Sequence, residues 1–110
     1  RVIIGAPLPP PKMHGYRFDR GENSDVSGVM LYDSEGQERS GYVTDYDYGN
    51  VFLTLDSKTS QKVIFLTEPQ GTSTLRMWGR NGNQIELGAG DEGVWINGFK
   101  NGEKTDLINR

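Results

Sequence analysis

Four segments of the chain repeat one pattern: an apolar strand, a polar turn and a second strand. They begin 23, 23 and 20 residues apart, and a glycine stands at the turn in three of them (Gly36, Gly82 and Gly102). Asn101-Gly102 is a dipeptide typical of type I′ hairpin turns. The pattern therefore predicts four consecutive β-hairpins, over residues 28–44, 51–67, 74–90 and 94–110.

The strands of these hairpins are apolar on both faces. Because side chains alternate along a strand, aligning the four repeats assigns each residue to a face. One face is interpreted as the core and collects Val29, Phe52, Leu75 and Trp95. The opposite face collects Met30, Tyr32, Leu53, Leu55 and Trp78. A strand that is apolar on both sides must be covered on both sides, either by a second sheet or by a neighbouring subunit. Because no segment has a helical period that could supply the cover, we expect the second face to contact another copy of the chain.

The length of 110 residues suits a single domain. We expect an N-terminal strand at residues 1–5, a proline-rich and polar loop at 6–27, and the four hairpin repeats at 28–110. Glycine contributes 15 residues, about twice the usual share, as an all-β protein with many turns requires. The predicted fold is a small all-β domain, with sandwich, barrel and prism-like arrangements left open.

Charge and composition exclude several kinds of partner. The net charge is −3, the pI is about 5.1 and the basic residues are scattered, which disfavours nucleic acid. The chain has no cysteine and no apolar run long enough to span a membrane. Arg1 stands within an apparent strand, so the cellular compartment stays open, with a removed export signal as one alternative.

The repeat itself resembles a set of uncharacterised bacterial β-repeat proteins. Their units read as a Gly-led apolar strand, a (Tyr/Leu)-Asp-x-x-Gly turn, a basic residue and a second strand, as in GVMLYDSEGQERSGYV from residue 28. The resemblance covers most of residues 1–5 and 28–90. The later units depart from it, with no turn glycine in the second, Gly79 for the aspartate in the third and Phe99 in the fourth. The resemblance implies a style of fold and a role in assembly, and it implies no activity.

Candidate chemistry is sparse, and no cofactor is predicted. His14 is the only histidine, and Ser24 or Ser27 with Asp19 or Asp25 stand near it without a nucleophile motif. Asp45 and Asp47 precede Gly49, and alternate aspartates before a glycine are a weak calcium signal. The aromatic residues that could stack on a sugar ring are Trp78, Tyr46 and Tyr48.

These observations favour a non-catalytic assembly or interaction protein that forms homo-oligomers through Met30, Tyr32, Leu53, Leu55 and Trp78. The alternative is a module that binds a small ligand or glycan through Trp78, Tyr46 and Tyr48. A small hydrolase is the third hypothesis.

Overall fold

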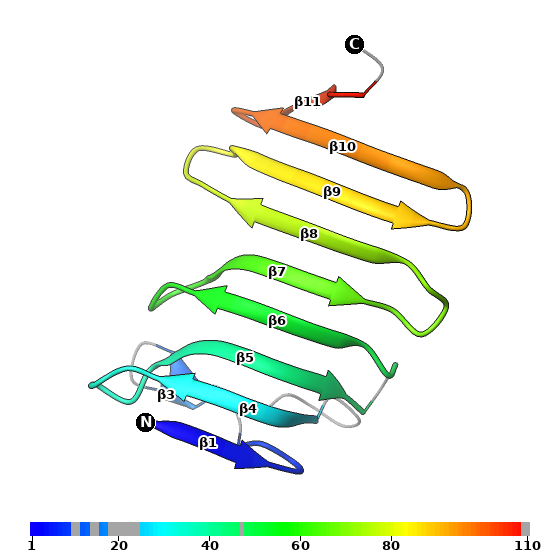
Figure 1. Ribbon diagram of the computed structural model, residues 1–110. Helices are drawn as coiled ribbons and strands as arrows, with labels where there is room; N and C mark the ends of the chain where they lie inside the picture. Colours follow the sequence, from blue (N-terminus) through cyan, green and yellow to red (C-terminus); the bar gives the residue numbers. More distant parts are fainter. Residues whose placement is uncertain (10–11, 14–15, 18–24, 47, 109–110) are drawn as a thin grey trace.

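The computed structural model describes residues 1–9, 12–13, 16–17, 25–46 and 48–108. Nine strands form one antiparallel sheet, and each strand after the first pairs with the strand before it in the sheet. In sheet order they are β1 (Val2–Gly5), β4 (Val26–Tyr32), β5 (Glu38–Asp45), β6 (Val51–Asp56), β7 (Gln61–Thr67), β8 (Ser73–Trp78), β9 (Gln84–Gly90), β10 (Gly93–Lys100) and β11 (Glu103–Asp106). A separate two-stranded sheet pairs β2 (Lys12–Met13) with β3 (Tyr16–Arg17). Figure 1 shows β3 behind the larger sheet.

The predicted repeats are the successive hairpins β4–β5, β6–β7, β8–β9 and β10–β11. Both residues of the Asn101-Gly102 turn have positive φ, 53° and 86°, as a type I′ turn requires. Asn81 and Gly82 in the turn of the preceding hairpin have similar φ angles, 60° and 75°. The turn chemistry visible in the sequence therefore forms as expected.

The sheet remains open. The edge strands β1 and β11 lie at its two ends (Figure 1), and each pairs with one neighbour in the sheet. The all-β class and the hairpin repeats are confirmed. Closure into a sandwich, barrel or prism is not observed in the part of the chain that the structure describes.

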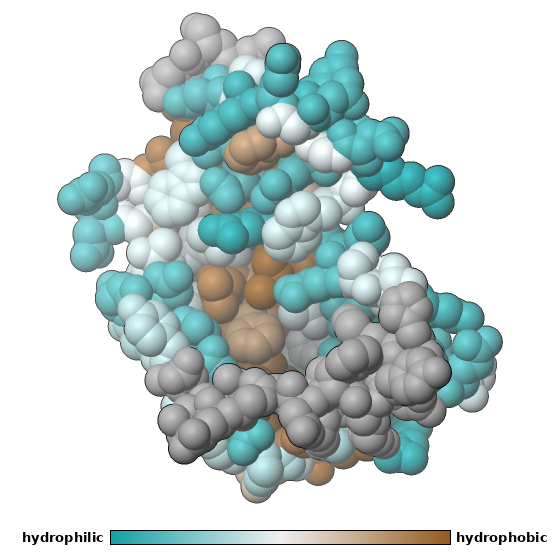
Figure 2. All heavy atoms as spheres, turned by 180° about the vertical axis from the view of Figure 1, so that it is seen from behind, coloured by the Kyte–Doolittle hydropathy of each residue, from teal (hydrophilic) through white to brown (hydrophobic). Residues whose placement is uncertain are grey.

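The two faces of the sheet are packed unequally. On one, the packed face, Val26, Met30, Tyr32 and Val43 are at most 7% exposed. Leu8 completes this cluster at 3% exposure, and its N–H donates to the Val26 carbonyl at 2.7 Å. The segment after β1 thus folds back over the packed face. Figure 2, which views this side, shows apolar atoms over the middle of the sheet and hydrophilic residues over its C-terminal end.

Strand register does not follow the sequence repeat. Val29, Leu53, Leu75 and Ile96 share a face because β-ladder pairs connect them, and their spacings are 24, 22 and 21 residues. The spacings of the sequence repeats are 23, 23 and 20, so each differs by one residue from the corresponding spacing along the paired strands. A difference of one residue moves a side chain to the opposite face of the sheet. The predicted core column is therefore wrong: Val29 and Leu75 lie on one face, and Phe52 and Trp95 on the other.

Candidate interaction surface

The face opposite the packed one, which we call the open face, is mainly apolar, with serine and threonine residues among the apolar ones. It consists of three cross-strand rows defined by the pairing of the strands. The central row is Ile4, Val29, Tyr42, Leu53, Phe65, Leu75, Leu87 and Ile96. The second row is Val2, Leu31, Ser40, Leu55, Val63, Met77, Ile85 and Gly98. The third row is Ser27, Thr44, Val51, Thr67, Ser73, Ala89 and Val94.

Large apolar side chains on the open face are exposed to solvent. Fourteen such residues are exposed among those that the structure describes, and eleven of them belong to the three rows. Ile4 is 79% exposed, Val94 70%, Tyr42 62% and Phe65 54%. Single exposed apolar residues are ordinary on protein surfaces, but a contiguous set of this size marks an interaction site.

Along its middle the open face is hollowed. The hollow has a volume of about 740 Å³ and is lined mainly by apolar atoms. The central row forms much of its lining, with Tyr42, Leu53, Phe65, Leu75, Leu87 and Ile96. This shape leaves room for side chains of a partner to enter between the rows.

Among the described residues, charged side chains are absent from the three rows of the open face and present on the packed face. None of the described positions in the three rows of the open face holds a charged residue. On the packed face of β8–β10, Arg76 Nε lies 3.2 Å from Glu86 Oε2, and Asn97 Nδ2 donates to Glu86 Oε1 at 3.3 Å. The packed face is thus suited to water over these strands, whereas the open face requires an apolar cover.

The open face contains only two of the five predicted interface residues. Leu53 and Leu55 lie on it, 38% and 52% exposed. Met30 and Tyr32 belong to the core of the packed face, 3% and 5% exposed, and Trp78 points to the same side because it follows Met77 in the strand. The prediction that the five share one face is wrong, because the repeat alignment and the strand register differ by one residue. Tyr42, Phe65 and Ile4 also lie on the open face and were not among the predicted interface residues.

The aromatic residues predicted to bind a glycan do not come together. Tyr46 and Tyr48 lie between β5 and β6, at the end of the sheet where β8 begins, whereas Trp78 is the last residue of β8. The Tyr46 hydroxyl accepts from Ser27 Oγ at 2.8 Å, and the Tyr48 hydroxyl accepts from Gln70 Nε2 at 3.1 Å. A single platform built from these three rings is therefore wrong.

Asp45 has a structural role in its loop. Its Oδ1 accepts the backbone N–H groups of Tyr48, Gly49 and Asn50 at 2.8–3.1 Å, and its Oδ2 accepts Asn50 Nδ2 at 2.9 Å. Partial burial raises the pKa of Asp45, but these hydrogen bonds outweigh it and hold the pKa below its usual range. Asp47 lies outside the described residues. Within the described residues, no group of three or more His, Cys, Asp or Glu side chains is placed to hold a metal ion.

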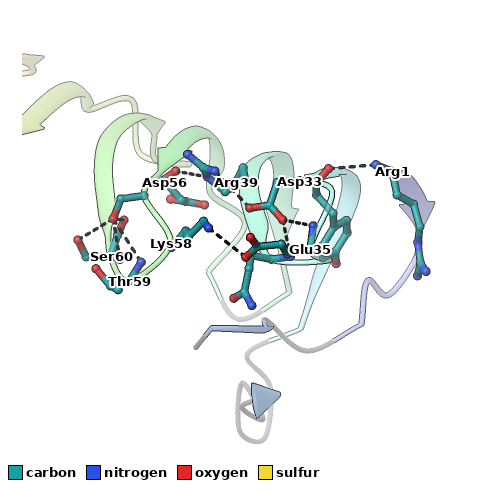
Figure 3. Close-up of polar contacts among 11 residues, drawn as sticks. Arg1, Asp33, Glu35, Arg39, Asp56, Lys58, Thr59 and Ser60 are labelled. Carbon is teal, nitrogen blue, oxygen red and sulfur yellow. Dashed lines mark hydrogen bonds and ion pairs between the residues drawn. The ribbon is translucent and has the colours of Figure 1, made fainter. Parts of the chain in front are cut away.

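Carboxylates at the hairpin ends are likewise used for structure, as Figure 3 shows. Asp33 Oδ1 accepts the N–H groups of Glu35 and Gln37 at 2.9 and 3.0 Å. The bond from Gln37 is the main reason that the pKa of Asp33 is lowered. Arg39 joins two neighbouring hairpins by donating to Asp33 Oδ2 at 3.2 Å and to the Asp56 carbonyl at 2.9 Å.

One carboxylate pair has an apolar setting that the sequence did not reveal. Asp56 and Glu38 line a cavity of about 130 Å³ together with Met30, Val43 and Phe52. Burial, followed by the nearby negative charge of Glu38, raises the pKa of Asp56 to about 7. Ligand pockets usually occupy about 300–1,000 Å³, so this cavity is too small for a sugar substrate. Sequence spacing could not reveal the pair, because the strand pairing shifts by one residue next to both Glu38 and Asp56, and the sequence does not mark either shift.

The remaining candidates for hydrolytic chemistry gain no support from geometry. His14, Asp19 and Ser24 lie outside the described residues. Ser27 stands in the third row of the open face, and Asp25 immediately precedes β4. The described part of the chain contains no helix with the length and apolarity needed to cross a membrane. Comparison with protein-family models, curated proteins and solved structures found no match to this chain.

Proposed function

We propose that this chain is a non-catalytic assembly module in which two copies pack open face against open face. The observation that carries the proposal is the placement of eleven exposed large apolar residues in three uncharged rows on one face of the sheet. Sheets that pack face to face lie about 10 Å apart with their side chains interdigitated. The hollow along the central row provides room for this interdigitation.

Estimated energies favour a face-to-face dimer. Full burial of a large apolar side chain stabilises by about 1.5–3 kcal/mol, so covering eleven that are each about half exposed amounts to roughly 10–15 kcal/mol per copy. When two copies cover each other, both contribute this stabilisation, which gives an upper bound of roughly 20–30 kcal/mol for the apolar burial in the dimer. Association costs about 4–15 kcal/mol, and ordering of side chains and desolvation of polar groups cost more, so only the surplus over these costs stabilises the dimer.

A second copy suits this surface better than a partner of different chemistry. The polar side-chain groups in the three rows are tyrosine, serine and threonine hydroxyls, which offer a charged partner hydrogen bonds but no opposite charge. An identical open face offers apolar rows to apolar rows. A two-fold axis between the copies closes the contact, so the assembly ends at two subunits on this face.

The test is the solution mass of matched variants, measured by size exclusion with light scattering. Leu55→Glu places a charge on the open face, and we expect it to dissociate the face-to-face contact. Leu55→Met conserves volume, and Gln84→Glu places a similar charge on the packed face; both are expected to keep the wild-type mass. The proposal is overturned if the wild-type chain runs at 12.3 kDa at all concentrations, or if Leu55→Glu keeps the wild-type mass.

A small apolar ligand is the second candidate occupant, because the hollow of about 740 Å³ falls within the usual size of ligand pockets. Its lining offers few polar groups to orient a ligand, which favours the assembly role. A monomeric wild-type chain that binds a hydrophobic fluorescent probe, with binding weakened by Phe65→Glu, would favour the ligand role instead.

A further inference from the structure

The two edges of the sheet differ in their resistance to strand pairing. Every residue of β11 is exposed, and the strand carries the charges of Glu103, Lys104 and Asp106. Natural sheets use charges of this kind to prevent an edge from pairing with another chain. β1 reads Val-Ile-Ile-Gly, without charge or proline, and its Ile4 is 79% exposed. Of the two edge strands, β1 therefore has the less protected sequence.

The backbone groups available on β1 follow from its pairing with β4. Arg1 and Tyr32 exchange two hydrogen bonds, from the Arg1 amino group to the Tyr32 carbonyl at 3.0 Å and from the Tyr32 N–H to the Arg1 carbonyl at 2.7 Å. Such pairs alternate along an antiparallel ladder, so Ile3 is bonded to β4, whereas the N–H and C=O groups of Val2 and Ile4 point away from it. No described strand pairs with this outer side of β1 (Figure 1).

We infer that β1 pairs in antiparallel fashion with β1 of a second copy, about a two-fold axis at Ile3. Val2 of each copy lies opposite Ile4 of the other, and each of these pairs exchanges both of its N–H···O bonds. This contact lies on the edge of the sheet and goes beyond the proposed packing of the open faces. Strand addition of this kind is a common mode of recognition at exposed sheet edges.

Side chains and charges are compatible with this register. Val2 and Ile4 belong to the open face, so pairing the edges continues its rows from one copy into the next. Arg1 lies beside Gly5 of the second copy, which keeps the two guanidinium groups at opposite ends of the paired strands. Pairing β1 with β11 would instead set an apolar strand beside a charged one and would leave the uncharged β1 edge of one copy unpaired.

Proline substitutions test the edge contact selectively. Ile4→Pro removes an N–H that points away from β4, and proline is tolerated at such edge positions. Lys104→Pro is the matched control on the other edge. The Leu107 N–H donates to the Ile96 carbonyl of β10, and N–H groups point alternately toward and away from the neighbouring strand. The Lys104 N–H, three residues before Leu107, therefore points away from β10. Circular dichroism monitors folding, and Ile4→Lys provides a second edge variant in case the proline variant does not fold.

The readouts are residue-resolved amide hydrogen exchange and solution mass. In the wild-type assembly we expect slow exchange at Val2 and Ile4, and fast exchange at Val2 in Ile4→Pro. In a Leu55→Glu background we expect twice the 12.3 kDa chain mass, reduced to 12.3 kDa by Ile4→Pro and unchanged by Lys104→Pro. Exchange of the wild-type Val2 and Ile4 amides at the rate of unprotected amides would overturn the inference and leave the proposed function standing. A Leu55→Glu chain that keeps the wild-type mass would overturn the proposed function and leave the edge contact standing.

Discussion

Asp56→Asn is expected to stabilise the protein at neutral and alkaline pH. The Asp56 side chain lies beside Glu38 in a small cavity, and its pKa is about 7 instead of 3.8. Between these two pH values the folded protein retains a proton that the unfolded chain has released, so stability falls as the pH rises. A shift of one pKa unit corresponds to about 1.36 kcal/mol, which sets an upper bound of about 4 kcal/mol for the whole shift.

The assay is urea unfolding at a fixed protein concentration, because association makes stability concentration-dependent. From pH 5 to pH 8 the wild-type chain is expected to lose about 2–3 kcal/mol of unfolding free energy, whereas Asp56→Asn is expected to lose much less. The lowered pKa values of Asp33 and Asp45 keep both carboxylates ionised across this range, so their contributions stay constant.

Glu38→Gln is the matched control for Asp56→Asn. It removes the negative charge that adds to the effect of burial, and is expected to reduce the pH dependence without abolishing it. A wild-type stability that stays constant or increases from pH 5 to pH 8 would refute the reasoning. Equal pH dependence in wild type and Asp56→Asn would assign the effect to another group.

Two further predictions concern packing and loop structure. An added Cβ at Gly88 would lie 2.0 Å from the Trp95 ring, so Gly88→Ala should lower the free energy of unfolding by about 1–3 kcal/mol and alter tryptophan fluorescence. Gly79→Ala is the control: the nearest contact of its Cβ would be 3.7 Å away, so it should lower the free energy of unfolding by less than about 1 kcal/mol. Equal unfolding midpoints of the two variants would contradict this. Asp45→Ala removes the acceptor of three backbone N–H groups and should cost about 1–3 kcal/mol, with a smaller loss for Asp45→Asn; thermal unfolding that is unaffected by Asp45→Ala would contradict the structural role.

Local signals in the sequence predicted the hairpins well. Glycine and asparagine at the turns tolerate positive φ, and short apolar runs on either side predict strands, because both effects act over a few residues. The strand at residues 1–5 and the four hairpins therefore agree with the structure. The first repeat strand begins at Val26, two residues before its predicted start, because the polar loop contains no signal that marks the boundary.

The candidate surface was predicted only in part. The sequence indicated a second apolar face, and Leu53 and Leu55 are members of it. Met30 and Tyr32 were assigned to the same face, although they form the core on the other side. Ladder irregularities at Leu31/Tyr32 and at Leu55/Asp56 shift the pairing by one residue, and the repeat pattern contains no sign of either shift.

The sequence by itself determined the N-terminal strand, the strands of the four hairpins and the turns between them, because alternation and turn chemistry are local properties. The short strands β2 and β3 lie within the segment predicted as a loop at residues 6–27, so there the prediction was wrong. The tertiary structure alone decided which residues share a face, since a cross-strand shift of one residue moves every side chain of a strand to the other side. It also decided which face is packed, because that depends on where Leu8 and its neighbours fold back. The exposed apolar rows, and with them the proposed assembly, follow from these two non-local facts.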